Sequence, residues 1–183
     1  CDDPFDRKTV LALVSEIPAR IFPVGRLDLD ADGLLLLTND GELTNLLTHP
    51  KHRVVKEYLV LVSGEGAEDK IGRIVSGMIV DGRRVDVDYV RLVKDRGGPL
   101  GKEAAKGQPR LSKVVIGVHE GEKHLVKNIC RAVGLRVRRL TRVRLGPIRL
   151  GNLPQGKWRR LEDSEVTALY ADACRVWEGE HHG

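Results

Sequence analysis

The pattern of hydrophobic and polar positions predicts more strands than helices. Short apolar runs and alternating stretches, both typical of strands, occupy residues 21–24, 34–38, 54–63, 79–95 and 111–118. Apolar residues at helical spacing predict helices over residues 8–16, 42–48, 68–76, 123–133 and 163–177. Because the strands outnumber the mostly short helices and do not alternate strictly with them, we expect an α+β fold with a mixed, largely antiparallel sheet.

The clearest alternation lies in residues 135–145. Four apolar residues share one side of the predicted strand, namely Leu135, Val137, Val143 and Leu145, and four arginines share the other, namely Arg136, Arg138, Arg142 and Arg144. This pattern predicts a half-buried strand with a basic ladder facing outward. The glycine-containing stretch that follows, 146–161, predicts a hairpin that ends in a strand over residues 159–161.

Charge is distributed unevenly along the chain. Residues 123–161 hold 12 Lys or Arg and no Asp or Glu, within a net charge of +5. Such a segment is typical of a surface that binds a polyanion, although a merely solvated basic surface would have the same composition. Residues 94–110 combine four Gly, two Pro and five basic residues, which predicts a mobile loop or an insertion.

Cysteine usage and hydropathy indicate the redox environment of the protein and its relation to membranes. The three cysteines are far apart and show no C-x-x-C spacing, so the sequence predicts neither a disulfide framework nor a zinc site. A reducing, cytoplasmic setting is therefore expected. Apolar runs such as Leu34–Leu37 are too short to span a bilayer, so we expect no membrane association. The chain starts at Cys1 without Met, which suggests a piece of a longer protein, and we expect it to be monomeric.

Three short motifs suggest a bound metal ion or phosphate, but each is incomplete. Residues 28–33 match the first half of a calcium loop, yet the closing position holds Asn39 in place of a bidentate carboxylate. Residues 151–157 have the spacing of a phosphate-binding loop, but Trp158 follows where Ser or Thr must hold magnesium. His49 and His52 lack a third ligand. We therefore expect no metal.

A longer set of motifs is more specific. Gly25-Arg26-Leu27-Asp28 precedes Gly33-Leu34-Leu35-Leu36-Leu37-Thr38-Asn39-Asp40-Gly41, and Lys56-Glu57-Tyr58, Val126-Lys127, Ala132-Val133-Gly134 and Arg142-Val143-Arg144-Leu145-Gly146-Pro147 follow in order. The series ends with the segment 153–161. This series, which covers essentially the whole chain, resembles the bacterial ribosomal-RNA pseudouridine synthases of the RsuA type.

The resemblance implies a fold and a set of roles. The fold would be that of a pseudouridine synthase, with two packed halves, a central active-site cleft and a catalytic domain over residues 1–183. Asp28 matches the catalytic aspartate, Tyr58 the active-site tyrosine and Lys127 the basic residue that pairs with the aspartate. An S4-type RNA-binding domain, common in this family, would precede Cys1.

The implied reaction breaks the glycosidic bond of a flipped-out uridine, rotates the uracil and joins its C5 to the ribose. No electrons are transferred and no group is lost, so no cofactor is expected. An ionised Asp28 would act either as a nucleophile at the sugar or as a base at the 2′ position, and the sequence does not choose between them. Tyr58 would stack on the extruded base.

The implied partner is ribosomal RNA. Arg26 would fill the space that the base leaves or hold a flanking phosphate, and the remaining basic residues would bind phosphates and fix the register of the RNA. These are Arg131, Arg136, Arg138, Arg142, Arg144, Lys157, Arg159 and Arg160. The alternative is a non-catalytic module that binds ribosomal RNA or assists ribosome assembly, which the basic ladder alone would serve.

Overall fold

The computed structural model describes residues 9–93 and 111–179, and the loop or insertion expected over residues 94–110 lies outside the described residues. The elements follow one another along the chain in this order: η1 (Val10–Val14), β1 (Phe22–Pro23), β2 (Asp32–Gly33), β3 (Leu37–Thr38), α1 (Gly41–Thr48), η2 (Pro50–His52), β4 (Lys56–Ser63), α2 (Ala67–Ile71), β5 (Met78–Val80), β6 (Arg83–Val85), β7 (Tyr89–Val93), β8 (Leu111–Val118), α3 (Leu125–Ala132), β9 (Arg136–Leu145), β10 (Ile148–Arg149) and α4 (Asp163–Gly179).

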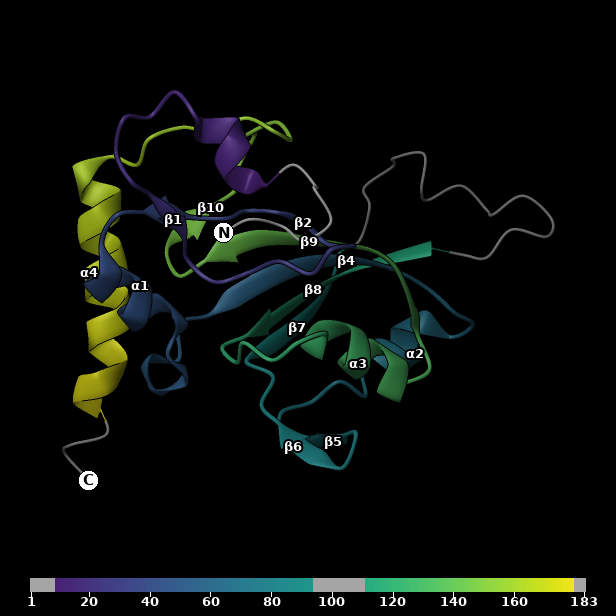
Figure 1. Ribbon diagram of the computed structural model, residues 1–183. Helices are drawn as coiled ribbons and strands as arrows, with labels where there is room; N and C mark the ends of the chain where they lie inside the picture. Colours follow the sequence, from purple (N-terminus) through teal and green to yellow (C-terminus); the bar gives the residue numbers. More distant parts are fainter. Residues whose placement is uncertain (1–8, 94–110, 180–183) are drawn as a thin grey trace.

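A central sheet organises the molecule. Its strands lie in the order β10-β9-β4-β8-β7 and are all antiparallel, while β2 adds to β9 in parallel (Figure 1). Helices α2 and α3 lie together on one side of this sheet, and β5 and β6 form a separate hairpin beyond them. The expected α+β fold with a mixed, largely antiparallel sheet is confirmed.

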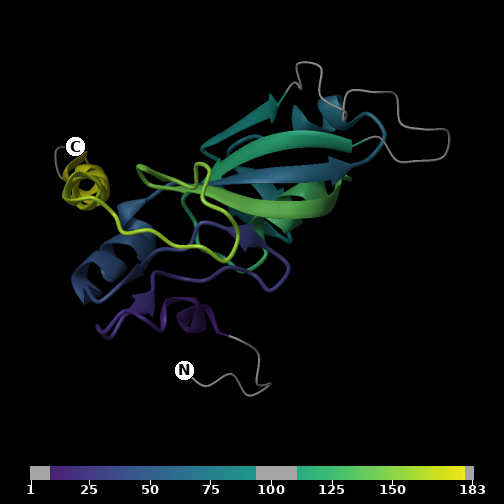
Figure 2. The same ribbon diagram turned by 90° about the horizontal axis from the view of Figure 1, so that it is seen from above.

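Two hydrophobic clusters form the core. The first lies between the central sheet and helices α2 and α3, and includes Val60, Ile116 and Ile129. The second joins α1, α4 and the segment before α1 to the end of β9, and includes Leu47 and Leu169. Figure 2 shows α4 end-on at the edge of the molecule, next to α1 and away from α2 and α3. The two clusters correspond to the two packed halves expected from the sequence.

The ends of α1 are explained by local chemistry. Asp40 caps the helix, because its Oδ1 accepts a hydrogen bond of 2.9 Å from the backbone N–H of Leu43. The other carboxylate oxygen accepts a hydrogen bond from the Tyr170 hydroxyl on α4. The helix ends before Pro50, as predicted. The cap therefore also fixes α1 against α4.

Several predicted boundaries differ from the structure. Within the helix expected over residues 8–16, the described residues 9–16 contain only a short 3₁₀ helix. The strand over 34–38 is confined to β3, and the helix over 68–76 is reduced to α2. Of the strands expected over 79–95, the described residues 79–93 hold two complete strands and most of a third. Residues 159–161 form no strand, and the hairpin after β9 is restricted to β10. In these short segments, tertiary contacts outweigh the local pattern.

The outward placement of Arg142 is wrong. Two irregularities interrupt the pairing of β4 with β9, one between Glu57 and Tyr58 and the other between Leu61 and Val62. An extra residue in one strand shifts the alternation of the side chains that follow it. Arg142 consequently pairs directly with Tyr58, and it is 3% exposed. The arginines of β9 therefore do not form one continuous outward ladder.

Candidate active site

Asp28 lies in a turn between β1 and β2. Its carbonyl oxygen accepts a hydrogen bond of 3.0 Å from the N–H of Ala31, and Gly25, with φ of +75°, allows the chain to bend just before it. The side chain is 22% exposed. The carboxylate is thus held at a surface opening rather than in a fully solvated loop.

Two cationic or titratable side chains approach the Asp28 carboxylate. Lys127 Nζ lies 3.4 Å from Asp28 Oδ2, and His124 Nε2 lies 3.7 Å from Asp28 Oδ1. Both come from the start of α3, where His124 precedes the helix with a positive φ of 60°. The buried residues of α3, among them Val126 and Ile129, hold its opposite face against the core. The structure therefore brings together Asp28 and Lys127, as the sequence resemblance implied.

The other two carboxylates of this turn have different partners. Lys127 also contacts Asp30, and this hydrogen bond holds the pKa of the Asp30 carboxyl below its usual value. Asp32 accepts from the guanidinium of Arg139 at 2.7 Å. Lys127 therefore bridges two carboxylates, of which Asp28 is the less exposed.

A cavity of about 320 Å³ opens beside Asp28. Its apolar lining comes from both halves of the molecule, since Val24 and Leu47 belong to the second core cluster and Val118 and Leu140 to the first. Its polar lining includes Asp28, Arg26, Lys56, Tyr58 and His124. The expected central cleft thus lies where the two halves meet.

Lys56 and Tyr58 reach the cavity from the same side of β4, as the alternation of that strand predicted. Tyr58 is partly buried and packs against the first core cluster. Lys56 is 8% exposed, and its ammonium donates a hydrogen bond of 2.8 Å to the carbonyl of His119. Burial, together with the charge of Arg142, lowers the pKa of Lys56 to about 8.

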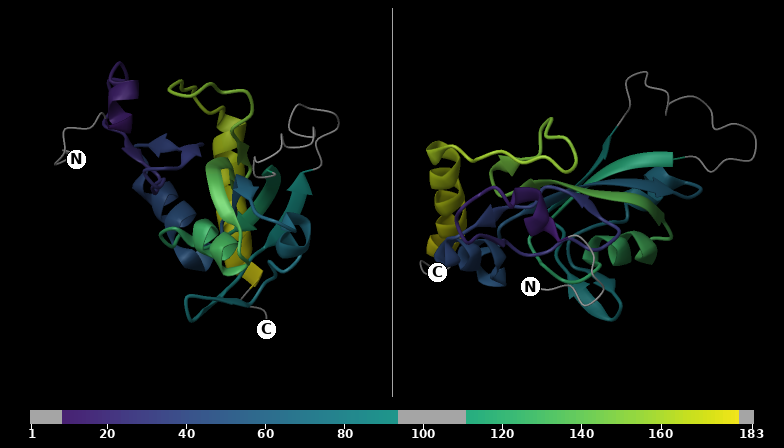
Figure 3. Two further views of the ribbon diagram at one scale, coloured as in Figure 1. Left: turned by 90° about the vertical axis from the view of Figure 1, so that its right-hand side faces the viewer. Right: turned by 45° about the horizontal axis from the view of Figure 1, so that its top comes forward.

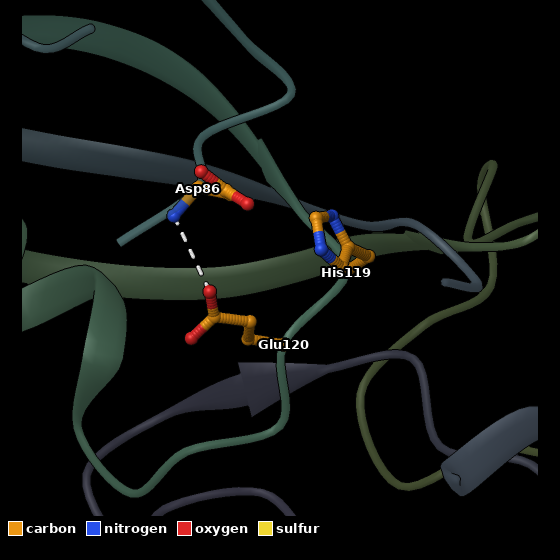
Figure 4. A group of neighbouring side chains, drawn as sticks. All are labelled: Asp86, His119 and Glu120. Atoms are coloured by element: carbon orange, nitrogen blue, oxygen red, sulfur yellow. Dashed lines mark hydrogen bonds between the residues drawn. The ribbon is translucent and has the colours of Figure 1, made fainter. Parts of the chain in front are cut away.

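Figure 4 shows a further polar group, formed by Asp86, His119 and Glu120, of which Glu120 also lines the cavity. One ligand atom from each lies within 4.8 Å of the others, so these side chains could approach a metal ion. Each already has a partner, however. Glu120 accepts from the backbone N–H of Asp86, and His119 Nδ1 lies 3.0 Å from both oxygens of Asp88. These contacts explain the cluster without a metal ion, as hydrogen bonds and an ion pair that join the start of β7 to the end of β8.

The proposed RNA-binding residues divide into two groups. Arg26, Arg136, Lys157 and Arg160 are exposed, and within the described ranges their side chains have no hydrogen-bonding partner. The others are already engaged: Arg131 with Asp81, Arg138 with Ser63, Arg144 with Gly146 and Glu57, and Arg159 with Glu165. Arg142 is also engaged, because it is buried and its guanidinium donates to backbone carbonyls.

Sequence reasoning missed His124 and Lys56 as residues of the cavity, and it placed Arg142 on the outward face instead of in the cavity lining. The signal for His124 was its position three residues before Lys127, since this spacing places two side chains on one face of a helix. Lys56 shares its strand face with Tyr58, which the alternation already showed. Arg142 gave no usable signal, because the bulges that turn it inward depend on the partner strand.

Comparison with known proteins now identifies the family. The model of the family described as RNA pseudouridylate synthase matches residues 7–132. The chain belongs to the RNA pseudouridylate synthase family. One relative is the "Uncharacterized RNA pseudouridine synthase" of Aquifex aeolicus (strain VF5), 41% identical over 167 residues, which are 91% of this chain and 62% of the relative.

Two further members of the RNA pseudouridylate synthase family extend the comparison. The "Ribosomal large subunit pseudouridine synthase B" of Bacillus subtilis (strain 168) is 33% identical over 170 residues, 92% of this chain and 65% of the relative. A crystal structure of a pseudouridylate synthase superimposes with a TM-score of 0.64 at 29% identity, covering 81% of this chain and 59% of the other. The chain therefore spans less than two thirds of the length of these relatives.

Proposed function

We propose that this chain is the catalytic domain of an enzyme that isomerises a uridine of ribosomal RNA to pseudouridine. The observation that carries the proposal is the position of Asp28, which lines the cavity between the two halves with Lys127 Nζ 3.4 Å from its carboxylate. Family membership supports the reaction. The name of the Bacillus subtilis relative, a ribosomal large subunit enzyme, supports the class of RNA, and with it a cytoplasmic setting.

In this proposal, Asp28 attacks the ribose or removes its 2′ proton while the glycosidic bond breaks. Lys127 supplies the countercharge, and its ammonium, 3.4 Å from Oδ2, favours the orientation of the carboxylate that keeps this oxygen toward it. His124 Nε2 lies 3.7 Å from the other carboxylate oxygen, so each oxygen of Asp28 has a side chain of the start of α3 beside it. The route through the nucleophile and the route through the base both require this arrangement.

Tyr58 is proposed to stack on the flipped uracil within the cavity, and Arg26 to occupy the space from which the nucleotide leaves the RNA or to hold a neighbouring phosphate. Both residues line the cavity, Tyr58 from the sheet and Arg26 from the segment before Asp28. A flipped nucleotide loses stacking within the RNA, and contact with an aromatic ring offsets part of that loss. The exposed basic residues would then hold the phosphates on either side.

The test is pseudouridine formation on transcripts of large-subunit and small-subunit ribosomal RNA. Isomerisation frees the C5 hydrogen of uridine, so tritium release from 5-tritiated transcripts measures the reaction directly. We expect the wild type to release tritium and Asp28→Asn to be slower by on the order of a thousandfold or more. As a matched control, Asp30→Asn should lose no more than about fivefold, since its contact with Lys127 is largely exposed.

The alternative function is a non-catalytic module that binds ribosomal RNA or assists ribosome assembly. The exposed arginines and lysines favour this function as much as they favour catalysis. It predicts RNA binding without tritium release, and equal behaviour of the wild type and Asp28→Asn in every assay. That outcome would exclude the enzymatic proposal.

A further inference from the structure

Arg142 has surroundings that are unusual for an arginine. It lies in β9 between Tyr58 of β4 on one side and Gly33 of β2 on the other. Its side chain is almost fully buried, and within residues 9–93 and 111–179 no carboxylate forms an ion pair with it. A buried guanidinium without a counterion is unfavourable unless its donors are used. The acceptors of the guanidinium N–H groups therefore indicate what Arg142 does.

Two of the three guanidinium nitrogens donate to backbone carbonyls on either side of Asp28. Arg142 Nε donates to the carbonyl of Leu34 at 2.7 Å, and Nη1 donates to the carbonyl of Arg26 at 3.3 Å. These carbonyls stand two residues before Asp28 and six residues after it. One side chain thus joins both ends of the segment that carries the proposed catalytic carboxylate.

The backbone of Arg142 reinforces this closure. Its carbonyl accepts a hydrogen bond of 2.7 Å from the N–H of Leu34, and Gly33 pairs with it in the parallel ladder. The third nitrogen, Nη2, is buried without a partner in the described part of the chain. The residue also lines the cavity beside Asp28. The guanidinium therefore supports the segment 26–34 and not the pairing of β9 with β4, because that pairing is made by the backbone.

We propose that Arg142 is a positioning residue for the reaction: its guanidinium joins the carbonyls of Arg26 and Leu34 and so sets where Asp28 stands relative to Lys127 and Tyr58. The inference rests on the proposed function. Small displacements of a reacting group cost much of its rate, so a residue that fixes the segment acts on turnover more than on RNA binding. In this proposal Arg142 holds the segment 26–34 rather than an RNA phosphate, because its side chain is only 3% exposed.

The experiment compares Arg142→Met, Arg142→Lys and Arg139→Met with the wild type. Arg142→Met keeps most of the buried volume but leaves both carbonyls without their donor. We expect its kcat to fall about a hundredfold while KM for RNA changes by less than about threefold. Arg142→Lys retains one donor and should recover part of the rate. Arg139→Met, which removes an exposed pair with Asp32 on the same segment, should stay within about threefold of wild-type kcat.

A fourth variant separates positioning from general support of the fold. Arg142→Ala leaves space for a guanidinium ion, and added guanidinium at low concentration should raise its kcat without raising its melting temperature. If Arg142→Met does not fold, Arg142→Lys and the rescue of Arg142→Ala decide the question. A folded Arg142 variant with wild-type kcat, a loss confined to KM, or an absence of rescue would overturn the proposal.

Asp28→Asn, measured in parallel, distinguishes this inference from the proposed function. If the wild type is active, Asp28→Asn is inactive and the Arg142 variants keep wild-type kcat, the positioning role of Arg142 is refuted and the proposed function is not. A wild type that releases no tritium from either transcript would refute the proposed function and this inference with it.

Discussion

At the scale of single residues, Lys127 illustrates how one side chain serves two neighbours. It contacts both Asp28 and Asp30, and its own side chain is 20% exposed. Asp30 is the more exposed of the two carboxylates, and the ion pair with Asp28 is the one proposed to orient the catalytic carboxylate. A cation in this position is poorly placed to serve RNA phosphates at the same time.

Replacing Lys127 by Met should therefore lower turnover more than affinity. We expect kcat for tritium release to fall by about ten- to a hundredfold, and the dissociation constant for RNA to change by less than about threefold. Lys123→Met is the matched comparison, because Lys123 is exposed at the rim of the same cavity. Lys123→Met should instead raise KM for RNA. A Lys127 variant that binds RNA poorly but turns over normally would contradict the orienting role.

Lys56 is a residue whose charge opposes folding. Its pKa is lowered from 10.5 to about 8 by burial and by Arg142. Below about pH 8 both the folded and the unfolded chain hold the proton, so the folded state carries the full cost of a buried ammonium. Between pH 8 and 10.5 the folded chain releases a proton that the unfolded chain keeps, and the free energy of unfolding rises with pH.

This linkage predicts a pH-dependent difference between the wild type and Lys56→Met. Over the interval from pH 8 to 10.5 the wild type should gain up to about 3 kcal/mol in free energy of unfolding relative to the variant. Urea denaturation at several pH values measures the difference, and contributions from other groups cancel in it. Lys51→Met, at an exposed lysine, should show no such trend. A flat difference for Lys56→Met would mean that its ammonium is solvated.

At the scale of elements, the meeting of β2 and β9 decides the geometry of the site. The two strands run parallel, with Gly33 opposite Arg142. Gly33 has φ of +111°, and a Cβ on it would stand 2.3 Å from the carbonyl oxygen and 2.6 Å from the nitrogen of Arg142. Only glycine allows this approach of two backbones. Figure 3 shows the segment that contains β2 running alongside the long strand β9.

Gly33→Ala should consequently destabilise the protein by about 3 kcal/mol or more, through backbone strain and displacement of β2. Thermal or urea unfolding measures the loss. Gly41→Ala is the control, because a methyl group at this position, at the start of α1, would have no atom within 4 Å of it, and it should change stability by less than about 1 kcal/mol. Equal stability of the two variants would show that β2 moves away from β9 without cost.

At the scale of the whole molecule, the internal pairing of the basic side chains bears on the proposed binding of RNA. The chain carries a net charge of +5, yet several arginines of the basic segment are paired internally. An arginine that must leave a carboxylate before it meets a phosphate contributes less to affinity than an unpaired one. In the described part of the chain no helix is long and apolar enough to cross a membrane.

RNA affinity should therefore fall steeply with salt, and single arginines should contribute unequally. Arg136→Gln is expected to reduce the slope of log affinity against log salt by about 0.7 to 0.9, the value for one phosphate contact. Arg159→Gln should reduce it less, since both guanidinium ends meet Glu165 at 2.7 Å. Binding measured across a range of salt concentrations tests both. A salt-independent affinity would exclude the basic surface as the RNA-binding face.

Local sequence patterns were enough to predict the class of fold, most strands of the central sheet, the helix after Asp40 and the family. Period-two alternation, a capping aspartate and turn glycines act over a few residues, so they can be read without the partner segments. The resemblance also named Asp28, Tyr58 and Lys127, and the structure brings all three to one cavity region: Asp28 and Tyr58 line it, and Lys127 contacts Asp28.

The contacts that Arg142, His124 and Lys56 make depend on the packing of distant segments. The bulges in β9 exist only in its pairing with β4, so the inward turn of Arg142 cannot be obtained from alternation within one strand. His124 meets Asp28 across 96 positions of sequence, and Lys56 meets the carbonyl of His119 across 63. Such contacts depend on how the two halves pack, and that packing is a property of the whole chain rather than of any local window.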